Sequence, residues 1–250
     1  MISHCHAGCK PDEVWDALSR LGILERAKDD SVNLTDWKPP TRTRELDEID
    51  RACRIDYAKR IWASTERVEG TIVEEYLRGR GIIIPIPPMV TYHPNIKIDG
   101  VWSEAMVVGA CDLVTDELKA VHVARLQRGA DCITRDMRRT YGCLSGAAVK
   151  LALPAEEIAI AEGVETALSH QQMFGTPTWA MLGTAGIACK NVFSNPIKRI
   201  TIAADDGDPG WRAAATAKER IEITGLQARI RLPLEGYSDF NDQLRDKRND

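Results

Sequence analysis

The sequence predicts an α/β protein in which a C-terminal parallel sheet with helical crossovers (a Rossmann-like arrangement) is preceded by a smaller α+β subdomain. Two observations carry this prediction. From residue 152 onward, short apolar runs alternate with helical patterns, as in parallel strands joined by crossover helices. Before that point, helical spacing over residues 45–80 gives way to strand-like runs over residues 82–125, which is typical of a mixed subdomain with an antiparallel sheet.

The N-terminal segments are expected to be small. Residues 1–28 combine a start rich in Cys and His with one helical pattern, in which Val14, Leu18 and Leu21 recur at helical spacing. Residues 29–44 are polar and contain a Pro-Pro pair, so we interpret them as a linker. The sequence therefore predicts four segments, which are 1–28, 29–44, 45–151 and 152–250.

The α+β subdomain is expected to begin with two helices and continue with strands. Ile55, Ala58 and Ile61 share one face of a helix, and Thr71 is a suitable N-cap for a second helix that ends near Gly79. The expected strands are VTYHP, EAMVVGACDLV and LKAVHVARL, at residues 90–94, 104–114 and 118–126.

The C-terminal domain alternates strands with helices. The expected strands are IAIAEG, PTWAMLG, RITIAADD and ARIRLPL, at residues 158–163, 177–183, 199–206 and 228–234. The clearest helices are residues 164–174 and 210–223, and the second is rich in alanine, a strong helix former. Ligands of such sheets bind outside the carboxyl ends of the strands, so residues at these ends are candidates for function.

Glu162 stands at the first of these strand ends. It follows a run of apolar residues, and Gly163 after it is expected to let the backbone turn tightly. A carboxylate in this position can act as a general acid or base, or help to hold a metal. The alternative is that Glu162 only begins a helix, where its charge interacts favourably with the helix dipole.

A second acidic group follows the strand at residues 200–204. Asp205, Asp206 and Asp208 lie within four positions, and like charges so close repel one another unless a cation compensates them. Oxygen ligands of this kind suit Mg²⁺ that keeps several waters and bridges to a phosphate. The alternative is a surface turn rich in Asp and Gly.

A third acidic group follows the last predicted strand. Asp239 and Asp242 belong to the run SDFND at residues 238–242. They either add charge near the same sheet edge, as support for a metal or active site, or cap the final helix.

Positive charge is concentrated in one part of the chain, although the net charge is −4. That net charge argues against a protein coated in basic residues for bulk nucleic-acid binding. Residues 119–150, however, contain seven Lys and Arg against two acids, and such a patch can bind phosphates. The alternative is a solvated charged face.

These motifs together resemble the Toprim domain shared by bacterial-type primases, topoisomerases and some nucleases. A strand followed by Glu-Gly, then a strand followed by Asp-x-Asp, then a downstream acidic run make up the resemblance. It is closest to plasmid and phage primase-like proteins, because residues 61–82, 104–112 and 141–151 also resemble the region that precedes Toprim there. The family pattern has Asp-x-Asp before the glycine, and here either Asp205 or the pair Asp206 and Asp208 matches it.

The resemblance implies a DNA primase-like nucleotidyltransferase that synthesises RNA primers on single-stranded DNA. Glu162 would be the catalytic acid or base, and the three aspartates would hold Mg²⁺ or Mn²⁺. The template and the NTPs would be bound by basic residues, which are Arg125, Arg128, Arg138, Arg139 and Lys150. A helicase or another replication protein is the expected partner. Two alternatives stay open: a Toprim-fold metal-dependent nuclease, and a catalytically impaired replication or mobilisation accessory protein.

The first residues, with the run HCHAGC, resemble the second knuckle of the zinc ribbon that precedes Toprim in primases. Zn²⁺ needs four ligands, usually as two pairs, and Cys5 and Cys9 supply one pair. His4, His6 or Cys53 would have to complete the site. The alternative is a metal-free remnant of the zinc ribbon.

Composition indicates the compartment. No run approaches the roughly 20 apolar residues that span a bilayer, and the N-terminus has no apolar signal core. The seven cysteines are scattered and odd in number, which favours reduced thiols. We therefore expect a cytoplasmic protein without a membrane partner.

Overall fold

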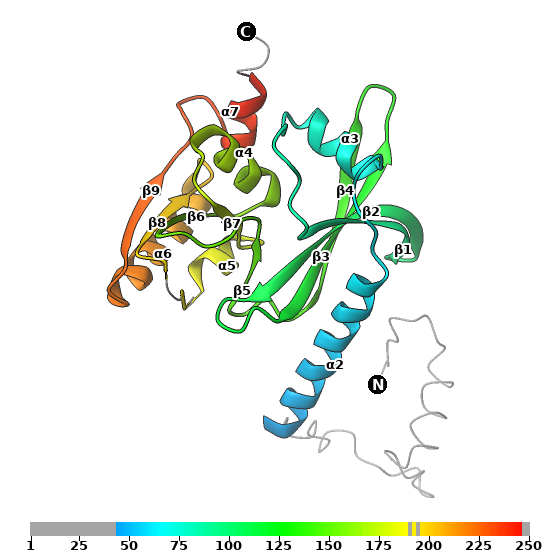
Figure 1. Cartoon of the computed structure of the whole chain (residues 1–250), viewed down its shortest axis with the longest axis horizontal. Coiled ribbons are helices and arrows are strands. Elements are labelled where there is room, and N and C mark those ends of the chain that lie inside the picture. Colours follow the sequence, from blue (N-terminus) through cyan, green and yellow to red (C-terminus); the bar gives the residue numbers. More distant parts are fainter. Residues whose placement is uncertain (1–43, 190–191, 194–195, 247–250) are drawn as a thin grey trace, which may run out of the picture. The chain divides into compact units, whose positions relative to one another are not determined.

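A computed structural model of the chain describes residues 44–189, 192–193 and 196–246. The chain divides into two compact units, Met1–Arg44 and Glu45–Asp250. The second unit contains two groups of strands, one antiparallel and one parallel, which appear on the right and on the left of Figure 1. In chain order its elements are α2 (Arg44–Ala63), α3 (Ile72–Gly79), β1 (Val90–Ile98), β2 (Val101–Asp112), β3 (Leu118–Arg128), β4 (Ile133–Gly142), β5 (Ala147–Lys150), β6 (Glu157–Ala161), α4 (Val164–Phe174), β7 (Thr178–Ala180), α5 (Thr184–Ala188), β8 (Arg199–Ala203), α6 (Asp208–Ile223), β9 (Gln227–Arg231) and α7 (Phe240–Asp246).

The antiparallel group is a sheet with one helix on each face. Strands β1 to β4 pair antiparallel in the order of the chain. On β2, Val107 faces a core shared with Ala58 and Ile61 of α2. The next residue, Val108, faces a core shared with Val73 and Leu77 of α3, since successive side chains of a strand point to opposite faces. As the sequence predicts, Thr71 caps α3, and its side chain accepts a hydrogen bond from the backbone N–H of Val73.

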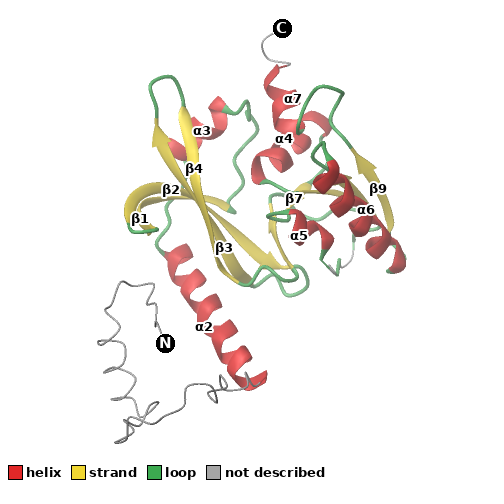
Figure 2. Cartoon of the chain, turned by 180° about the vertical axis from the view of Figure 1, so that it is seen from behind, coloured by secondary structure: helices red, strands yellow, loops and turns green. Residues whose placement is uncertain are grey.

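The parallel group is sandwiched between helices, as Figure 2 shows from behind. Strands β7, β6, β8 and β9 are parallel neighbours. Within β6, Ile158 and Ile160 face a core shared with α5 and α6, while Ala161 faces a core shared with α4 and α7. This alternation of large and small apolar side chains explains why the run IAIA is buried on both faces. The predicted fold class, a parallel sheet with crossover helices after an α+β subdomain, is confirmed.

The short strand β5 joins the two groups into one sheet, a connection that no pattern in the sequence predicts. It pairs antiparallel with β2 on one side and with β7 on the other. The full strand order is β4-β3-β2-β5-β7-β6-β8-β9, with β1 paired to β2. Backbone hydrogen bonds of β5 to β2 and to β7 therefore fix the parallel strands in position relative to the antiparallel ones.

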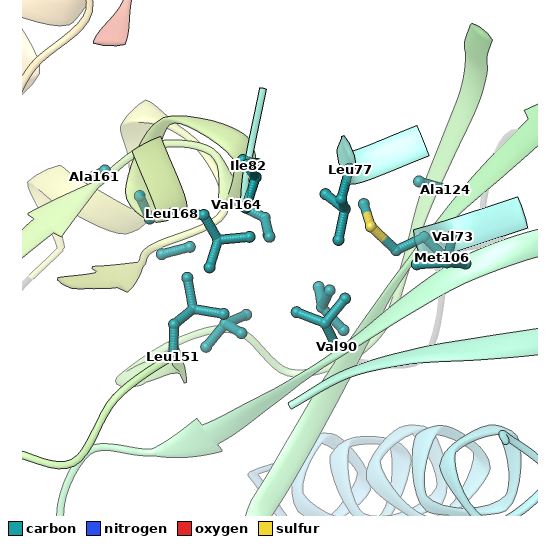
Figure 3. Close-up of a cluster of buried hydrophobic side chains, with 14 of the residues drawn as sticks. Val73, Leu77, Ile82, Val90, Met106, Ala124, Leu151, Ala161, Val164 and Leu168 are labelled. Atoms are coloured by element: carbon teal, nitrogen blue, oxygen red, sulfur yellow. The ribbon is translucent and has the colours of Figure 1, made fainter. Parts of the chain in front are cut away.

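A common apolar core also holds the two groups together, and so do the hydrogen bonds of Gln172 to residues 81–84, which we call the Gln172 clasp. Figure 3 shows Val73 and Leu77 of α3 in the same cluster as Val164 and Leu168 of α4. The side chain of Gln172 on α4 also hydrogen-bonds to the backbone of the segment after α3. Its oxygen accepts from the N–H groups of Ile83 at 2.7 Å and Ile84 at 3.2 Å, and its amide donates to the carbonyl of Gly81 at 3.0 Å.

The helix α7 adds a second polar contact to the same segment. The buried side-chain amide of Asn241 donates to the carbonyl oxygen of Arg80 at 2.8 Å and to the hydroxyl of Ser169 at 2.9 Å. Residues 80–84 are thus fixed by α4 and α7 of the parallel group. This matters for the site because Arg80 lines the cleft described below.

Candidate active site

The two main acidic groups meet at the carboxyl ends of β6 and β8. Ala161 and Ala203 are directly paired in the parallel register, so Glu162 and the residues after Ala203 leave the sheet side by side. Asp205 is partly buried there. Its burial and the charges of Glu162 and Asp239 raise the pKa of Asp205 to about 7. Glu162, Asp205 and Asp239, far apart in sequence, therefore form one electrostatic cluster.

The other two aspartates of the second group lie on the outside of the same turn. Both Asp206 and Asp208 are exposed. The backbone N–H of Asp206 donates to the carbonyl oxygen of Ser238 at 2.8 Å, and the carboxylate of Asp208 pairs with Arg212 at 3.3 Å. Of the three predicted metal ligands, Asp205 is the partly buried one, and the charge of Glu162 contributes to its raised pKa.

In the third acidic group, Asp239 fits both readings that the sequence left open. Its carboxylate accepts a hydrogen bond from the backbone N–H of Asp242 at 2.8 Å, which caps α7. The same side chain contributes to the raised pKa of Asp205. The carboxylate of Asp242 accepts a hydrogen bond from the hydroxyl of Ser238.

Two glycines near the acids differ in what they do for the backbone. A Cβ at Gly210 would lie 2.5 Å from the carbonyl oxygen of Asp205, so glycine is required where α6 starts against the acidic turn. Gly163, in contrast, has φ −105° and ψ 161°, and a Cβ there would come no closer than 3.7 Å to Thr166. The expectation that Gly163 is needed for a tight turn was wrong, because its backbone is extended and open to any residue.

The chemistry of the cluster fits a divalent cation. The Oδ1 atom of Asp205 is buried and accepts no hydrogen bond from any described residue. Burial and neighbouring negative charge both disfavour the ionised form, and a cation would relieve both effects. In the described parts of the chain, no three His, Cys, Asp or Glu side chains are grouped closely enough to enclose a metal. This pattern suits Mg²⁺ better than Zn²⁺, because Mg²⁺ commonly uses one or two carboxylates together with waters and substrate phosphates.

A cleft rich in arginine lies between α3, the β3–β4 hairpin and α7. Its volume is ≈ 830 Å³. Four arginines line it, which are Arg80, Arg128, Arg135 and Arg245. Arg128 pairs with Glu75 at 3.0 Å, and Arg135 pairs with Glu165. The Nε atom of Arg80 is buried without a hydrogen-bond partner among the described residues. Such a concave, positively charged surface can bind phosphates.

Of the five basic residues predicted to bind nucleotide or DNA, this cleft includes Arg128. The others lie elsewhere. Arg125 pairs with Asp136, and Arg139 pairs with Asp99 at 2.8 Å. Lys150 pairs with Asp116 and lies 5.1 Å from the centroid of the Trp179 ring. The exposed Arg138 lies near His122, and burial together with the charge of Arg138 lowers the pKa of His122 to about 4.

Sequence reasoning missed several residues of the site. Arg80 and Arg245 lie in helix-end segments where charged residues are ordinary, and Arg135 is one of seven Lys and Arg in residues 119–150 that sequence alone does not distinguish. Glu165 carries no signal of its own in the sequence, because a glutamate in the first turn of a helix is usually exposed, yet here it is buried. The alternation in ITRDMRRTYG was the available signal for β4, since it predicts a strand that presents Arg135 on one face.

Cys5 and Cys9 lie outside the described residues, as do His4 and His6. Cys53 is an exposed free cysteine of α2. The zinc half-site therefore stays a prediction. Within the described parts of the chain, no helix is both long and apolar enough to span a bilayer.

Comparison with known families agrees with this architecture. Residues 157–250 match the family model described as Toprim domain, and residues 52–151 match that of a domain of unknown function, DUF7146. The C-terminal part of the chain is a Toprim domain. With the α+β region in front of it, the described part of the chain has a fold similar to that of a primase catalytic core.

Solved structures of primases are similar in fold at low sequence identity. The catalytic core of Escherichia coli primase matches with a TM-score of 0.51 and 12% identity, over 78% of this chain and 75% of that one. A DnaG catalytic core matches with a TM-score of 0.50 and 13% identity, over 79% and 76%. The primase fragment of the bacteriophage T7 primase-helicase protein matches with a TM-score of 0.46 and 16% identity. That match covers 70% of this chain and 66% of the T7 fragment, slightly less than two thirds of its length. No significant sequence match was found among curated proteins.

Proposed function

We propose that the chain is a primase-like nucleotidyltransferase that joins NTPs into short RNA primers on single-stranded DNA and depends on Mg²⁺. The observation that carries this proposal is the convergence of Glu162 and Asp205 at the carboxyl ends of β6 and β8, with the charge of Asp239 acting on Asp205 from the turn before α7. The cleft lined by four arginines supports it, because a polymerase must bind the phosphates of both template and nucleotide. The Toprim match and the primase-like fold agree with this activity.

In the reaction, the 3′-hydroxyl oxygen of the growing primer attacks the α-phosphorus of the incoming NTP. A new P–O bond forms, the bond to the departing pyrophosphate breaks, and the hydroxyl proton moves to Glu162 or to water. Mg²⁺, when bound, neutralises phosphate charge and favours in-line displacement. Glu162 and Asp205 would hold it together with waters and substrate phosphates, and Asp239 would add negative charge beside them. Asp206 and Asp208, the other two predicted ligands, are exposed on the same turn.

The arginines of the cleft have a separate task in this proposal. Arg80, Arg128, Arg135 and Arg245 would bind the phosphates of the template strand and the NTP, and so bring the reacting groups to the acids. A replication partner such as a helicase, and a role in plasmid or phage replication, belong to the same proposal. They follow from the resemblance to plasmid and phage primase-like proteins.

The test is primer synthesis by the purified chain. Single-stranded DNA, the four NTPs and Mg²⁺ are incubated with the wild type and with Glu162→Gln and Asp205→Asn. Asp56→Asn, which removes an exposed ion pair with Arg60 on α2, is the control. We expect oligoribonucleotides from the wild type and the control, and a loss on the order of 10²-fold or more with Glu162→Gln, as for removal of a general base.

Two outcomes would contradict the proposal. One is that the wild type makes no template-dependent product, and the other is that Glu162→Gln makes as much as the wild type. A parallel incubation with supercoiled and single-stranded DNA and Mn²⁺ detects strand cleavage. Cleavage without synthesis would overturn the primase activity in favour of a Toprim-fold nuclease.

The cation is tested without reference to activity. Mg²⁺ in excess over its Kd should raise the melting temperature of the wild type, because a ligand that binds only the folded state stabilises it. Asp205→Asn should show a smaller rise, and Asp56→Asn should match the wild type. Equal rises in all three proteins would remove Asp205 from the proposed cation site.

A further inference from the structure

Glu165 is a buried carboxylate that connects the Toprim domain to the wall of the arginine cleft. It lies in the first turn of α4 and is 5% exposed. Its Oε1 atom accepts a hydrogen bond from the hydroxyl of Tyr76 on α3 at 2.8 Å, and the same atom pairs with the guanidinium of Arg135 on β4. This side chain of α4, in the parallel part of the fold, thus contacts two elements of the antiparallel part, α3 and β4.

The charged state of Glu165 follows from these contacts. Burial alone would raise its pKa, but the charge of Arg135, the hydrogen bond from Tyr76 and the charge of Arg80 outweigh burial. The net result is a pKa below the ordinary value of a glutamate. Glu165 is therefore ionised and attracts Arg135, and an ionised buried group without that partner would be strongly disfavoured.

The partner of Glu165 is a residue of the cleft itself. Arg135 and Tyr76 both line the ≈ 830 Å³ cleft, and the side chain of Arg135 is 26% exposed. Arg135 lies on β4, an edge strand of the sheet next to the β3–β4 hairpin, where the backbone is paired on one side only. Without a fixed partner, a long arginine side chain in such a place would sample many rotamers.

The position of Glu165 along the chain connects this pair to the acidic cluster. Glu162 precedes Glu165 by three residues, at the end of β6 and just before α4 begins. The backbone between them is held by two hydrogen bonds: the carbonyl oxygen of Gly163 accepts from the N–H of Ala167 at 3.0 Å, and that of Glu162 accepts from the N–H of Gly183 at 3.2 Å. The position of Arg135 relative to the backbone of Glu162 is thus set through this short segment.

We propose that Glu165 is a positioning residue. It holds Arg135 and Tyr76, the wall of the cleft, at a fixed place relative to Glu162, so that a polyanion bound by the arginines is presented to the acids. This inference rests on the proposed function for its effect on primer synthesis. The part of the inference that concerns the ordering of Tyr76 and Arg135 by Glu165 does not depend on any enzymatic activity.

The test compares Glu165→Gln with the wild type and with Glu156→Gln. Gln keeps the size of Glu165 and a hydrogen-bond acceptor for Tyr76 but loses the charge that holds Arg135. Glu156 forms exposed ion pairs with Lys198 and Arg199 at the other end of β6, which makes Glu156→Gln a matched loss of charge on the same domain. Amide hydrogen exchange is measured for peptides that cover residues 133–137 of β4 and residues 213–221 of α6.

We expect Glu165→Gln to speed exchange in the β4 peptide by about tenfold and to leave the α6 peptide unchanged, as for a local opening. Glu156→Gln should leave the β4 peptide at the wild-type rate. In primer synthesis, Glu165→Gln should lower kcat about tenfold or more while KM for the NTP changes little, since misplacement costs rate more than binding. Glu165→Gln in an Arg135→Ala background should cost little more, because both changes remove one interaction.

Three results would overturn the inference. These are wild-type exchange in the β4 peptide of Glu165→Gln, an equal acceleration in β4 and α6, and full additivity with Arg135→Ala. A wild type that makes no primers would refute the proposed function and the catalytic effect of Glu165. The exchange data would then decide by themselves whether Glu165 orders the cleft wall.

Discussion

Gly210 lies directly against the backbone of Asp205, so that a Cβ at position 210 would stand 2.5 Å from the Asp205 carbonyl oxygen. The contact brings the first turn of α6 onto the acidic turn that follows β8. The orientation of Asp205 therefore depends on the packing of α6, and we expect even a small side chain at position 210 to displace Asp205.

Gly210→Ala should displace this turn. We expect a loss of about 1–3 kcal/mol in the free energy of unfolding, the usual range for overpacking, together with reduced primer synthesis. Urea unfolding followed by circular dichroism measures the first effect. Gly79→Ala is the control for stability, because a Cβ at Gly79 would meet no heavy atom within 4 Å. Equal stability of Gly210→Ala and the wild type would contradict the contact.

Asp205 should make the metal-free protein less stable as the pH rises. Its pKa is about 7 in the folded chain, against 3.8 as the ordinary value, so between pH 4 and 7 the folded state binds more protons than the unfolded state. Stability therefore falls over this range and the full penalty is present above pH 7.

Asp205→Asn removes this penalty. In EDTA at pH 8 the variant should be more stable than the wild type by roughly 1–3 kcal/mol, and the difference should vanish near pH 4. Thermal or urea unfolding at several pH values measures it. A constant difference across the pH range would show that burial and the charges of Glu162 and Asp239 do not act on Asp205 as described.

Gln172→Ala should loosen the segment that follows α3. The change leaves the N–H groups of Ile83 and Ile84 and the carbonyl of Gly81 without their partner, and we expect a cost of about 1–3 kcal/mol in stability. Gln227→Ala, at an exposed glutamine that starts β9, should change stability by less than ~0.5 kcal/mol. Similar losses of stability in both variants would argue against a stabilising role of the Gln172 clasp.

Arg80→Ala should weaken the binding of single-stranded DNA and lower its dependence on salt. Each phosphate contact that is lost reduces the slope of log K against log salt by about one unit. Fluorescence anisotropy with a labelled oligonucleotide at several salt concentrations measures both quantities. Arg199→Ala, at an exposed arginine paired with Glu156 and Glu157 away from the cleft, is the matched control and should leave the slope unchanged.

Much of the fold could be predicted from local patterns. The expected helix at residues 164–174 agrees with α4, and the run RITIA forms β8 as its apolar alternation indicates. Local patterns also placed Glu162 and Asp205 at strand ends, because a strand ends where its apolar run does. Strand β5 was missed, since AAVK is short and its two pairings lie with β2 and β7.

The candidate site was predictable only in part for a related reason. The sequence of Asp205, Asp206 and Asp208 does not indicate which of the three side chains is buried. The packing of α6 against the turn buries Asp205 and leaves Asp206 and Asp208 exposed. The same limit applies to the arginines, because charge in sequence does not reveal which side chains have carboxylate partners nearby.

By itself, the sequence determined where strands and helices form and which strand ends carry acids, because periodicity and capping act over a few neighbouring residues. Only the tertiary structure decided which of these residues meet. The hydroxyl of Tyr76 reaches Glu165 across 89 positions of the chain, and Arg135 reaches the same carboxylate from another strand. Such contacts depend on the order and packing of the whole sheet, and no local pattern contains that information.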